Sequence, residues 1–535
     1  MAKATQDLWW KSGIIYEVYA RSFQDSNGDG IGDIRGLIQR LDYLQWLGVN
    51  AVWLTPVYPS PMKDLGYDIS DYTGIDPVFG KLNDFEELLN EVHSRGMKLV
   101  VDFIPNHSSD HHPWFQESRS SKDNPKRNWY IWKDAGPDGA EPNNWLSVLG
   151  GPAWAWDKHT GQYYYHTFLK EQPELNLRNP DVLKAMLEAM RFWLDKGVDG
   201  FRVDVMWYLI KDEKFRDNPV NPDYKPDMPS SEQLIQAYSS NQPGVHDIVR
   251  QFRKLLDEYS EKVMIGELYL SINKIVDYYG ANNGGAHLPG NHQLLLLPWE
   301  VKKVAAAIDK YEAALPDGAW PNWVIGNHDQ PRVLSRIGRG QAKVAAMLLL
   351  SLRGTPIMYY GDEIGMENVE IPREEQKDPQ GLLMENNKSR DPQRTPMQWD
   401  ASENAGFTTG KPWLRLPKSF EQQNVEAQKK DPHSLLNFYR QLIQLRQKEP
   451  ALMMGDYYPV LTDGKLLAYI RRGKGSTSFL LVLNMTDKAV DFKPKDRGIR
   501  GRVVLSTNRD WEEQELETGS RLEANEGVLA RLADT

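Results

Sequence analysis

Cysteine is absent from all 535 residues of the chain. The protein therefore forms no disulfide and no thiolate metal site, and it has no cysteine nucleophile. Long apolar runs are absent too, since none approaches the ~20 residues that a membrane-spanning helix needs. The N-terminal stretch MAKATQDLWWKSG also lacks the apolar core of a secretory leader. We expect a cytoplasmic protein that does not associate with a membrane.

An excess of positive charge is also missing. The 64 Lys and Arg residues stand against 74 Asp and Glu residues, which gives a formal net charge of -10. This balance argues against nucleic acid or an anionic membrane surface as a partner, and it favours a neutral small molecule. Aromatic residues are plentiful, with 18 Trp and 24 Tyr. They suit the faces of sugars, although ordinary core packing accounts for most of them.

Short apolar runs alternate with helical patterns through most of about the first 450 residues. This alternation predicts a parallel sheet with crossover helices. Seven strands are expected to begin at Ile14, Ala51, Lys98, Gly200, Val263, Asn322 and Thr355, and a weaker eighth near HQLLLLP from His292. Eight such units predict an α/β fold, the (β/α)₈ or TIM barrel, whose active site lies at the carboxyl ends of the strands.

Helices between these strands are indicated by apolar residues at a spacing of 3.6. One stripe consists of Leu37, Leu41, Leu44 and Leu47, and another of Phe85, Leu88, Leu89 and Val92. Asp33 and Asp84 precede or begin these stripes, so we expect them to be N-caps.

Two stretches depart from the barrel pattern. Residues 106–177, rich in Trp, Pro, Gly and Asn, follow the third strand and are predicted to form a small inserted domain. From residue 456 the pattern changes to alternating strands such as KLLAYIRR and SFLLVLNM, which predicts a C-terminal antiparallel β-sandwich over 456–535. The catalytic barrel would then comprise 1–105 and 178–455.

Short motifs at the predicted strand ends carry the chemistry. Four of them occur in order: DFIPNH at Asp102, GFRVDV at Gly200, GELY at Gly266 and NHD at Asn327. Three more are GYDISDY at Gly66, QPELN at Gln172 and RTPMQW at Arg394. One such phrase would be weak evidence, but the ordered set resembles the alpha-amylase superfamily. Within it the chain is similar to the alpha-glucosidase and oligo-1,6-glucosidase group over nearly its whole length.

The resemblance implies retaining hydrolysis of a glycosidic bond by paired carboxyl groups. Asp204 would be the nucleophile, Glu267 the general acid/base and Asp329 a third carboxylate that binds sugar hydroxyls. We expect Arg202, two residues before the nucleophile on the same strand face, to keep it ionised. Desolvation at the end of an apolar strand would raise the pKa of Glu267, as its role requires. Single acidic residues are usually solvated surface charges, but three at strand ends are hard to explain that way.

The same resemblance implies a set of substrate contacts. His107 and His328 would hydrogen-bond the glucose at the cleavage point, Tyr67 would stack on its face, and Phe168 would line the boundary with the leaving group. The alternative is that the histidines are structural and the aromatic residues pack in the core.

A clamp at the non-reducing end is also implied. Asp68 and Arg394 match residues that hold this end of the substrate, and such a clamp would restrict the enzyme to chain ends. An endo-acting amylase is disfavoured on this ground.

The loop DSNGDGIGD carries oxygen ligands at alternating positions, namely Asp25, Asn27, Asp29, the Ile31 carbonyl and Asp33. This spacing is typical of a hard-cation loop, although Gly36 stands where the full calcium pattern has a bidentate Glu. Related alpha-glucosidases bind calcium or magnesium in this loop, so we expect a structural Ca²⁺ or Mg²⁺. A retaining glycosidase needs no catalytic cofactor. The alternative is an ordinary turn in which Asp33 caps the next helix.

The sequence therefore predicts an exo-acting retaining alpha-glucosidase. It would hydrolyse short alpha-glucosides of the maltose or isomaltose type from the non-reducing end through a covalent glucosyl-enzyme, with some transglucosylation. One alternative is a glucosyl isomerase or transferase such as trehalose synthase, which resembles the chain through PSPMKDLGYDISDY. Another is a non-catalytic binding subunit, which the three carboxylates disfavour. Val205 resembles the alpha-1,6 type of enzyme, but Met206 and Trp207 depart from it, so the linkage preference stays open.

Overall fold

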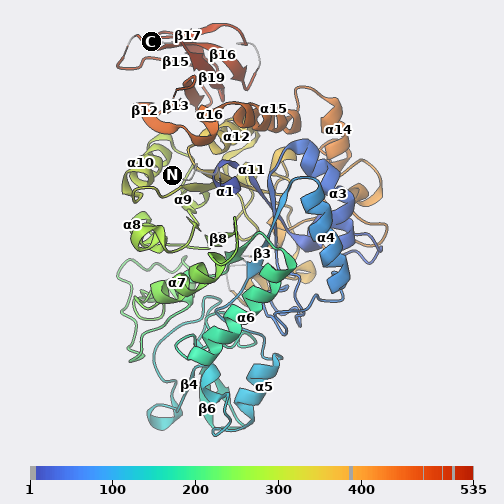
Figure 1. Ribbon diagram of the computed structural model, residues 1–535, viewed down its shortest axis with the longest axis vertical. Helices are drawn as coiled ribbons and strands as arrows, with labels where there is room; N and C mark the ends of the chain where they lie inside the picture. Colours follow the sequence, from blue (N-terminus) through green and yellow to red (C-terminus); the bar gives the residue numbers. More distant parts are fainter. Residues whose placement is uncertain (1–7, 385–388, 474, 497, 509–511, 534–535) are drawn as a thin grey trace.

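The computed structural model describes residues 8–384, 389–473, 475–496, 498–508 and 512–533. Residues 1–7, which belong to the stretch inspected for a leader, lie outside these ranges. Figure 1 shows three parts along the long axis, with a barrel in the middle, a small sheet at one end and the C-terminal sheets at the other. Within the described ranges, no helix is long and apolar enough to cross a membrane.

The barrel is an eight-stranded parallel sheet in the order β10-β11-β1-β2-β3-β7-β8-β9. Its strands are β1 (Ile15–Val18), β2 (Ala51–Leu54), β3 (Lys98–Phe103), β7 (Gly200–Val203), β8 (Val263–Gly266), β9 (Leu288–Pro289), β10 (Asn322–Val324) and β11 (Thr355–Tyr359). Their residues are buried almost throughout, because helices cover the outside and side chains fill the inside. The predicted fold class is confirmed.

The barrel closes between β9 and β10 through one side chain. The side-chain oxygen of Asn322 accepts the backbone N–H of Asn291 at 2.9 Å, and its side-chain NH₂ group donates to the backbone carbonyl of Pro289 at 2.6 Å. The eighth strand was predicted at HQLLLLP, and this placement is wrong. Residues 293–296 form the helical turn α9 (Gln293–Leu296), and the strand lies just before it. An apolar run of four leucines does not by itself distinguish a strand from a helix.

Helices pack around the barrel, and Figure 1 shows α3 and α4 along one side of it and α7, α8 and α10 along the other. The main ones are α3 (Ile34–Leu47), α4 (Leu82–Ser94), α6 (Pro180–Lys196), α7 (Val245–Leu256), α8 (Ile272–Ile275), α10 (Val301–Ala314), α12 (Ala342–Ser351) and α15 (Leu435–Lys448). Both predicted apolar stripes, on α3 and α4, are buried.

The two predicted N-caps have different outcomes. The Asp33 carboxylate accepts the N–H of Gly36 and caps α3 as predicted. The prediction for Asp84 is wrong, because it lies inside the first turn of α4 and its carboxylate accepts the N–H of Lys81 at 2.8 Å. An acidic side chain in the first turn stabilises a helix from either place, so composition alone does not fix the boundary.

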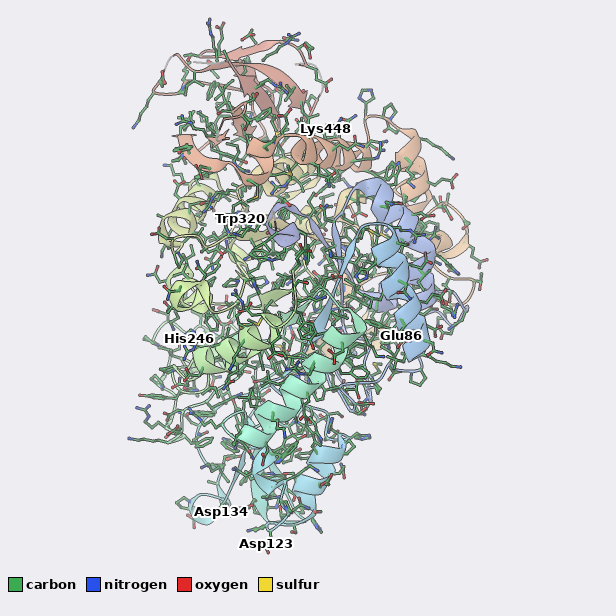
Figure 2. All side chains as sticks on the ribbon, viewed as in Figure 1. Glu86, Asp123, Asp134, His246, Trp320 and Lys448 are labelled. Carbon is green, nitrogen blue, oxygen red and sulfur yellow. The ribbon has the colours of Figure 1, made fainter. Side chains whose placement is uncertain are left out.

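The segment between β3 and α6 contains α5 (Pro113–Ser120) and a small antiparallel sheet. Its strands β4 (Trp132–Lys133), β6 (Gln162–Tyr165) and β5 (Trp154–Asp157) pair in that order. A separate core of Trp145, Ala153, Trp154 and Tyr165 holds it together. Asp123 and Asp134 mark its outer tip, at the opposite end of the molecule from Lys448 (Figure 2).

The C-terminal part contains a six-stranded antiparallel sheet and a two-stranded one. The larger consists of β12 (Asp456–Thr462), β13 (Leu466–Arg472), β14 (Phe479–Asn484), β19 (Gly527–Leu532), β16 (Arg500–Ser506) and β17 (Glu515–Glu517), and the smaller of β15 (Val490–Asp491) and β18 (Arg521–Leu522). One face of the large sheet joins the main core, and the other packs on Phe492 and Leu522 near the small sheet.

Candidate active site

Three carboxylates meet around one buried arginine at the carboxyl ends of β3, β7 and β8. The Arg202 guanidinium lies 2.8 Å from the Asp102 carboxylate, 2.6 Å from Asp204 and 2.9 Å from Glu267. The parallel register explains the meeting, because it places Asp102 beside Arg202 and the last residue of β8 beside that of β7. The structure therefore brings together the predicted nucleophile and the predicted acid/base.

The Asp204 and Glu267 carboxyl groups titrate as a pair. Burial and the Glu267 charge raise the pKa of Asp204, and Arg202 opposes them. Burial also raises the pKa of Glu267, again against Arg202. Arg202 thus lowers the pKa of Asp204, in the direction predicted, and it lowers the pKa of Glu267 as well. One proton remains on the pair to a higher pH than an isolated carboxyl group would hold it, and the second site is left negative.

Val205 adopts a strained backbone conformation directly after Asp204. Its φ of 37° lies in the left-handed region, which is unfavourable for a β-branched side chain. Such strain costs about 1–3 kcal/mol and persists where the surrounding structure enforces it. Here it directs the Val205 N–H to the Glu267 carboxylate at 2.7 Å, so this backbone turn helps to hold the second carboxyl group.

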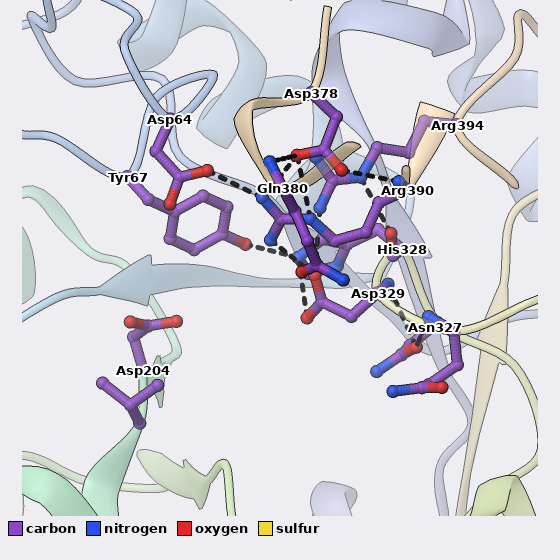
Figure 3. A network of polar contacts seen from close by, with 12 residues as sticks. Asp64, Tyr67, Asp204, Asn327, His328, Asp329, Asp378, Gln380, Arg390 and Arg394 are labelled. Atoms are coloured by element: carbon purple, nitrogen blue, oxygen red, sulfur yellow. Dashed lines mark hydrogen bonds and ion pairs between the residues drawn. The ribbon is translucent and has the colours of Figure 1, made fainter. Parts of the chain in front are cut away.

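Asp329 lies among two arginines and a histidine, shown in Figure 3. Its carboxylate is 2.9 Å from the Arg394 guanidinium, 3.2 Å from Arg390 and 3.4 Å from His328. Burial alone would raise the pKa of Asp329, but His328 and the two arginines hold it below its usual value. This third carboxylate is therefore ionised at neutral pH.

Arg390 joins Asp329 to two further carboxylates, at 2.8 Å from Asp64 and 2.7 Å from Asp378. Asp64 comes from the loop after β2 and Arg390 from the segment after β11, so the ion pair links distant parts of the chain (Figure 3). Neither Asp64 nor Arg390 was predicted from the sequence.

The predicted clamp of Asp68 and Arg394 is not formed as expected. Asp68 does not line the cavity described below, since its carboxylate is buried against the Ser60 hydroxyl and the N–H groups of Lys63 and Asp64. Burial raises its pKa to about 6. Arg394 lies behind the cavity wall, where it donates to the His328 carbonyl at 2.8 Å. Asp64 and Arg390, each four residues earlier in the chain and just before these motifs, occupy the wall instead.

The other predicted substrate contacts do lie together. The Tyr67 ring stacks on His328 with centroids 5.6 Å apart, and its hydroxyl is 2.8 Å from the His328 Nε2 atom. His107 packs edge-on against Phe168 at 5.3 Å, and burial lowers the pKa of His107 to about 4. Burial also lowers the pKa of His328. Both imidazoles are neutral hydrogen-bonding groups at physiological pH.

These side chains surround one cavity of about 750 Å³. Its charged wall includes Asp64, Asp204, Glu267, Asp329 and Arg390, and its apolar wall includes Leu149, Phe168, Val205, Trp207, Tyr208 and Met384. A cavity of this size with converging polar groups suits a small ligand. Charged groups beside apolar surface suit a sugar, which has hydroxyls at its edge and C–H groups on its faces.

The expected cation loop is folded around its own backbone. Asp25 accepts the N–H groups of Asn27, Gly28 and Gly30, and Asp29 accepts that of Ile31. Among the described residues, no group of three or more His, Asp or Glu side chains is arranged to hold a metal ion. The donors of this loop, however, include an amide and a backbone carbonyl, and oxygen donors of this kind suit Ca²⁺ or Mg²⁺.

Comparison with known proteins decides the family. A model of the alpha-amylase catalytic domain matches residues 17–455. The chain belongs to the alpha-amylase family. Among curated members of this alpha-amylase family, it is 40% identical to an oligo-1,6-glucosidase of Parageobacillus thermoglucosidasius, over 95% of this chain and 96% of the relative. It is 39% identical to an alpha-glucosidase of Apis mellifera, over 92% and 90% of the two chains.

Solved structures of alpha-amylase-like proteins share the whole architecture. The alpha-glucosyl transfer enzyme XgtA superposes with a TM-score of 0.92 at 37% identity, covering 99% of this chain and 100% of that one. The isomaltulose synthase SmuA from Protaminobacter rubrum superposes with a TM-score of 0.90 at 33% identity, again over 99% and 100%. The chain is thus similar to proteins named as glucosidases, as a glucosyl transfer enzyme and as an isomaltulose synthase.

Proposed function

We propose that the protein is an exo-acting retaining alpha-glucosidase that hydrolyses short alpha-glucosides. The observation that carries the proposal is the cavity in which Asp204 and Glu267 share Arg202, while the Asp64–Arg390 ion pair lies in the same wall. The names of the curated relatives, oligo-1,6-glucosidase and alpha-glucosidase, support this activity and a glucoside substrate.

The proposed reaction uses the carboxyl pair in two steps. Glu267 gives its proton to the glycosidic oxygen while Asp204 attacks the anomeric carbon, so the C–O bond to the leaving group breaks as a glucosyl ester forms. Glu267 then removes a proton from water, which displaces Asp204 and releases glucose with retained configuration. The ionised Asp329 accepts hydrogen bonds from sugar hydroxyls, which strengthen as positive charge develops on the ring.

Restriction to chain ends follows from the ion pair. Because Asp64 and Arg390 bridge two segments at 2.8 Å, we infer that a polysaccharide cannot pass this point and that the terminal glucose binds against it. This assigns to Asp64 and Arg390 the role that the sequence analysis gave to Asp68 and Arg394.

The test is product analysis with maltose, isomaltose, trehalose, sucrose and starch, using Asp204→Asn as the inactive control. Release of free glucose from disaccharides, with little action on starch, is the expected result. The isomerase or transferase alternative draws on the similarity to a trehalulose synthase and an isomaltulose synthase, and rearranged disaccharide with little glucose would support it. No turnover of any substrate would favour a binding subunit.

We also propose that the Asp25–Asp33 loop binds a structural Ca²⁺ or Mg²⁺ through Asp25, Asn27, Asp29, the Ile31 carbonyl and Asp33. The oxygen-only donor set supports a hard cation. The ion would stabilise the turn before α3 and would take no part in the reaction. Isothermal titration with Ca²⁺ and Mg²⁺ tests this, with Asp29→Ala as the comparison.

A further inference from the structure

Glu17 is a fully buried acid on β1 that the proposed reaction does not use. One carboxylate oxygen lies 2.5 Å from the Nδ1 atom of His328, and the other has no hydrogen-bond partner among the described residues. The opposite side of the imidazole is in the active site, where Nε2 is 2.8 Å from the Tyr67 hydroxyl and 3.4 Å from the Asp329 carboxylate. Glu17 therefore contacts the back of a ring whose front lines the cavity.

A neutral imidazole has one ring proton, and its place depends on Glu17. With the proton on Nδ1, one Glu17 oxygen accepts it, and the other oxygen is buried without a partner whether it carries the negative charge or the acid proton. The bare Nε2 atom then accepts the Tyr67 hydroxyl at 2.8 Å, which takes that donor from Asp102, and it also faces the ionised Asp329 at 3.4 Å, which places two acceptors together. Both features are unfavourable in a buried site.

With the proton on Nε2, the same contacts are satisfied. A protonated Glu17 donates to Nδ1, and Nε2–H points toward the Tyr67 oxygen and the Asp329 carboxylate. The Tyr67 hydroxyl is then free to donate to Asp102 at 3.3 Å. Only a neutral oxygen of Glu17 is left without a partner, which is far less costly than a charged one.

The surroundings of Glu17 also favour its neutral form. Charged and titratable groups face it from the neighbouring elements: Asp102 on β3, Arg202 on β7, His328 and Asp329 after β10, and Tyr359 on β11. Burial raises the pKa of Glu17 most strongly and the two aspartates raise it further, whereas Arg202 and the hydrogen bond with His328 lower it, and the net shift is upward. Arg202 is already shared by three other carboxylates.

We propose that Glu17 is a positioning residue that stays protonated, donates to Nδ1 of His328 and so keeps the ring proton on Nε2. This inference rests on the proposed hydrolysis for its purpose. His328 then presents a hydrogen-bond donor to a sugar hydroxyl at the cleavage point, whereas a bare Nε2 would only accept. Ionisation of Glu17 moves the proton to the back of the ring and removes that donor.

The test is the tautomer of His328 in the substrate-free protein at pH 6, measured by ¹⁵N NMR with labelled histidine. The His328→Gln variant identifies the signal, and Glu363→Gln is the matched control, because Glu363 is equally buried but contacts Tyr16 and Tyr43. The expected result is Nε2–H in the wild type and the same tautomer in Glu17→Gln, whose amide donates as the protonated acid does.

Nδ1–H in the wild type overturns the proposal, and so does a change to Nδ1–H in Glu17→Gln. In kinetic assays we expect Glu17→Gln to change kcat by less than about threefold, because the amide keeps the hydrogen bond to Nδ1. This is a smaller change than the loss of one typical hydrogen bond would cause. The NMR measurement needs no turnover. A wild type with the Nε2–H tautomer but no activity therefore refutes the proposed function and leaves the role of Glu17 standing.

Discussion

Replacing Arg202 with Met removes the cation that three buried carboxylates share at 2.6–2.9 Å. An adjacent arginine lowers the pKa of an aspartate by about 1–3 units, so its loss raises the pKa of Asp204 by about that amount. A raised pKa means that the nucleophile remains protonated to higher pH. The acid limb of the kcat/KM profile therefore moves up by about 1–3 units, and activity on that limb falls about 10- to 1000-fold.

The assay is kcat/KM for maltose between pH 4 and pH 8. Arg216→Met is the control, because Arg216 is an exposed arginine that also pairs with a buried carboxylate, Asp212, and is not paired with Asp204 or Glu267. Arg202→Lys keeps a charge without the fork that reaches three partners, so we expect a smaller shift. A variant with low activity but an unmoved acid limb would refute the electrostatic reasoning and leave Arg202 a purely structural role. Circular dichroism of each variant checks the fold.

Three further predictions concern the cavity wall and the loop before α3. Arg390→Met loses a charged hydrogen bond to Asp329, worth about 1.5–3 kcal/mol, so kcat/KM for maltose should fall about 10- to 100-fold; an unchanged value would contradict a role in binding. Removal of divalent cations with EDTA should lower the thermal midpoint, and Ca²⁺ should restore it; a midpoint that does not respond would remove the proposed ion. Asp33→Ala removes the cap of α3 and should lower the free energy of unfolding by about 0.5–2 kcal/mol, measured in EDTA, while Asp33→Asn should lose less.

Much of the barrel was predictable because its strands are short apolar runs that end in polar residues. Such a run is buried on both faces, so an apolar run between two helical patterns indicates a strand. The eighth strand escaped because β9 has only two residues and closes the barrel with the help of the Asn322 side chain. A contact made by one amide across 31 residues of sequence leaves no periodic signal.

The carboxylates at the strand ends were predictable once the strands were, because residues at the carboxyl ends of barrel strands lie at the active-site face. Loop residues were not. Asp64 and Asp68 lie four residues apart, and between Pro59 and Asp68 the chain passes through positive φ values at Met62 and Leu65. These backbone reversals turn Asp64 toward the cavity and Asp68 into the loop. The residue types in this segment do not predict where the reversals occur. Arg390 lines the cavity and Arg394 lies behind it, on either side of the short 3-10 helix Asp391–Gln393.

The ion pair between Asp64 and Arg390 also determines the order in which products leave the cavity in the proposed reaction. If substrate enters with its terminal glucose toward this pair, the leaving group stays nearest the mouth and must depart first. Water, or a second sugar, then reaches the glucosyl ester by the route that the leaving group has vacated. Glucose is consequently the last product to leave. Whether water or a second sugar occupies the mouth of the cavity decides between hydrolysis and transfer.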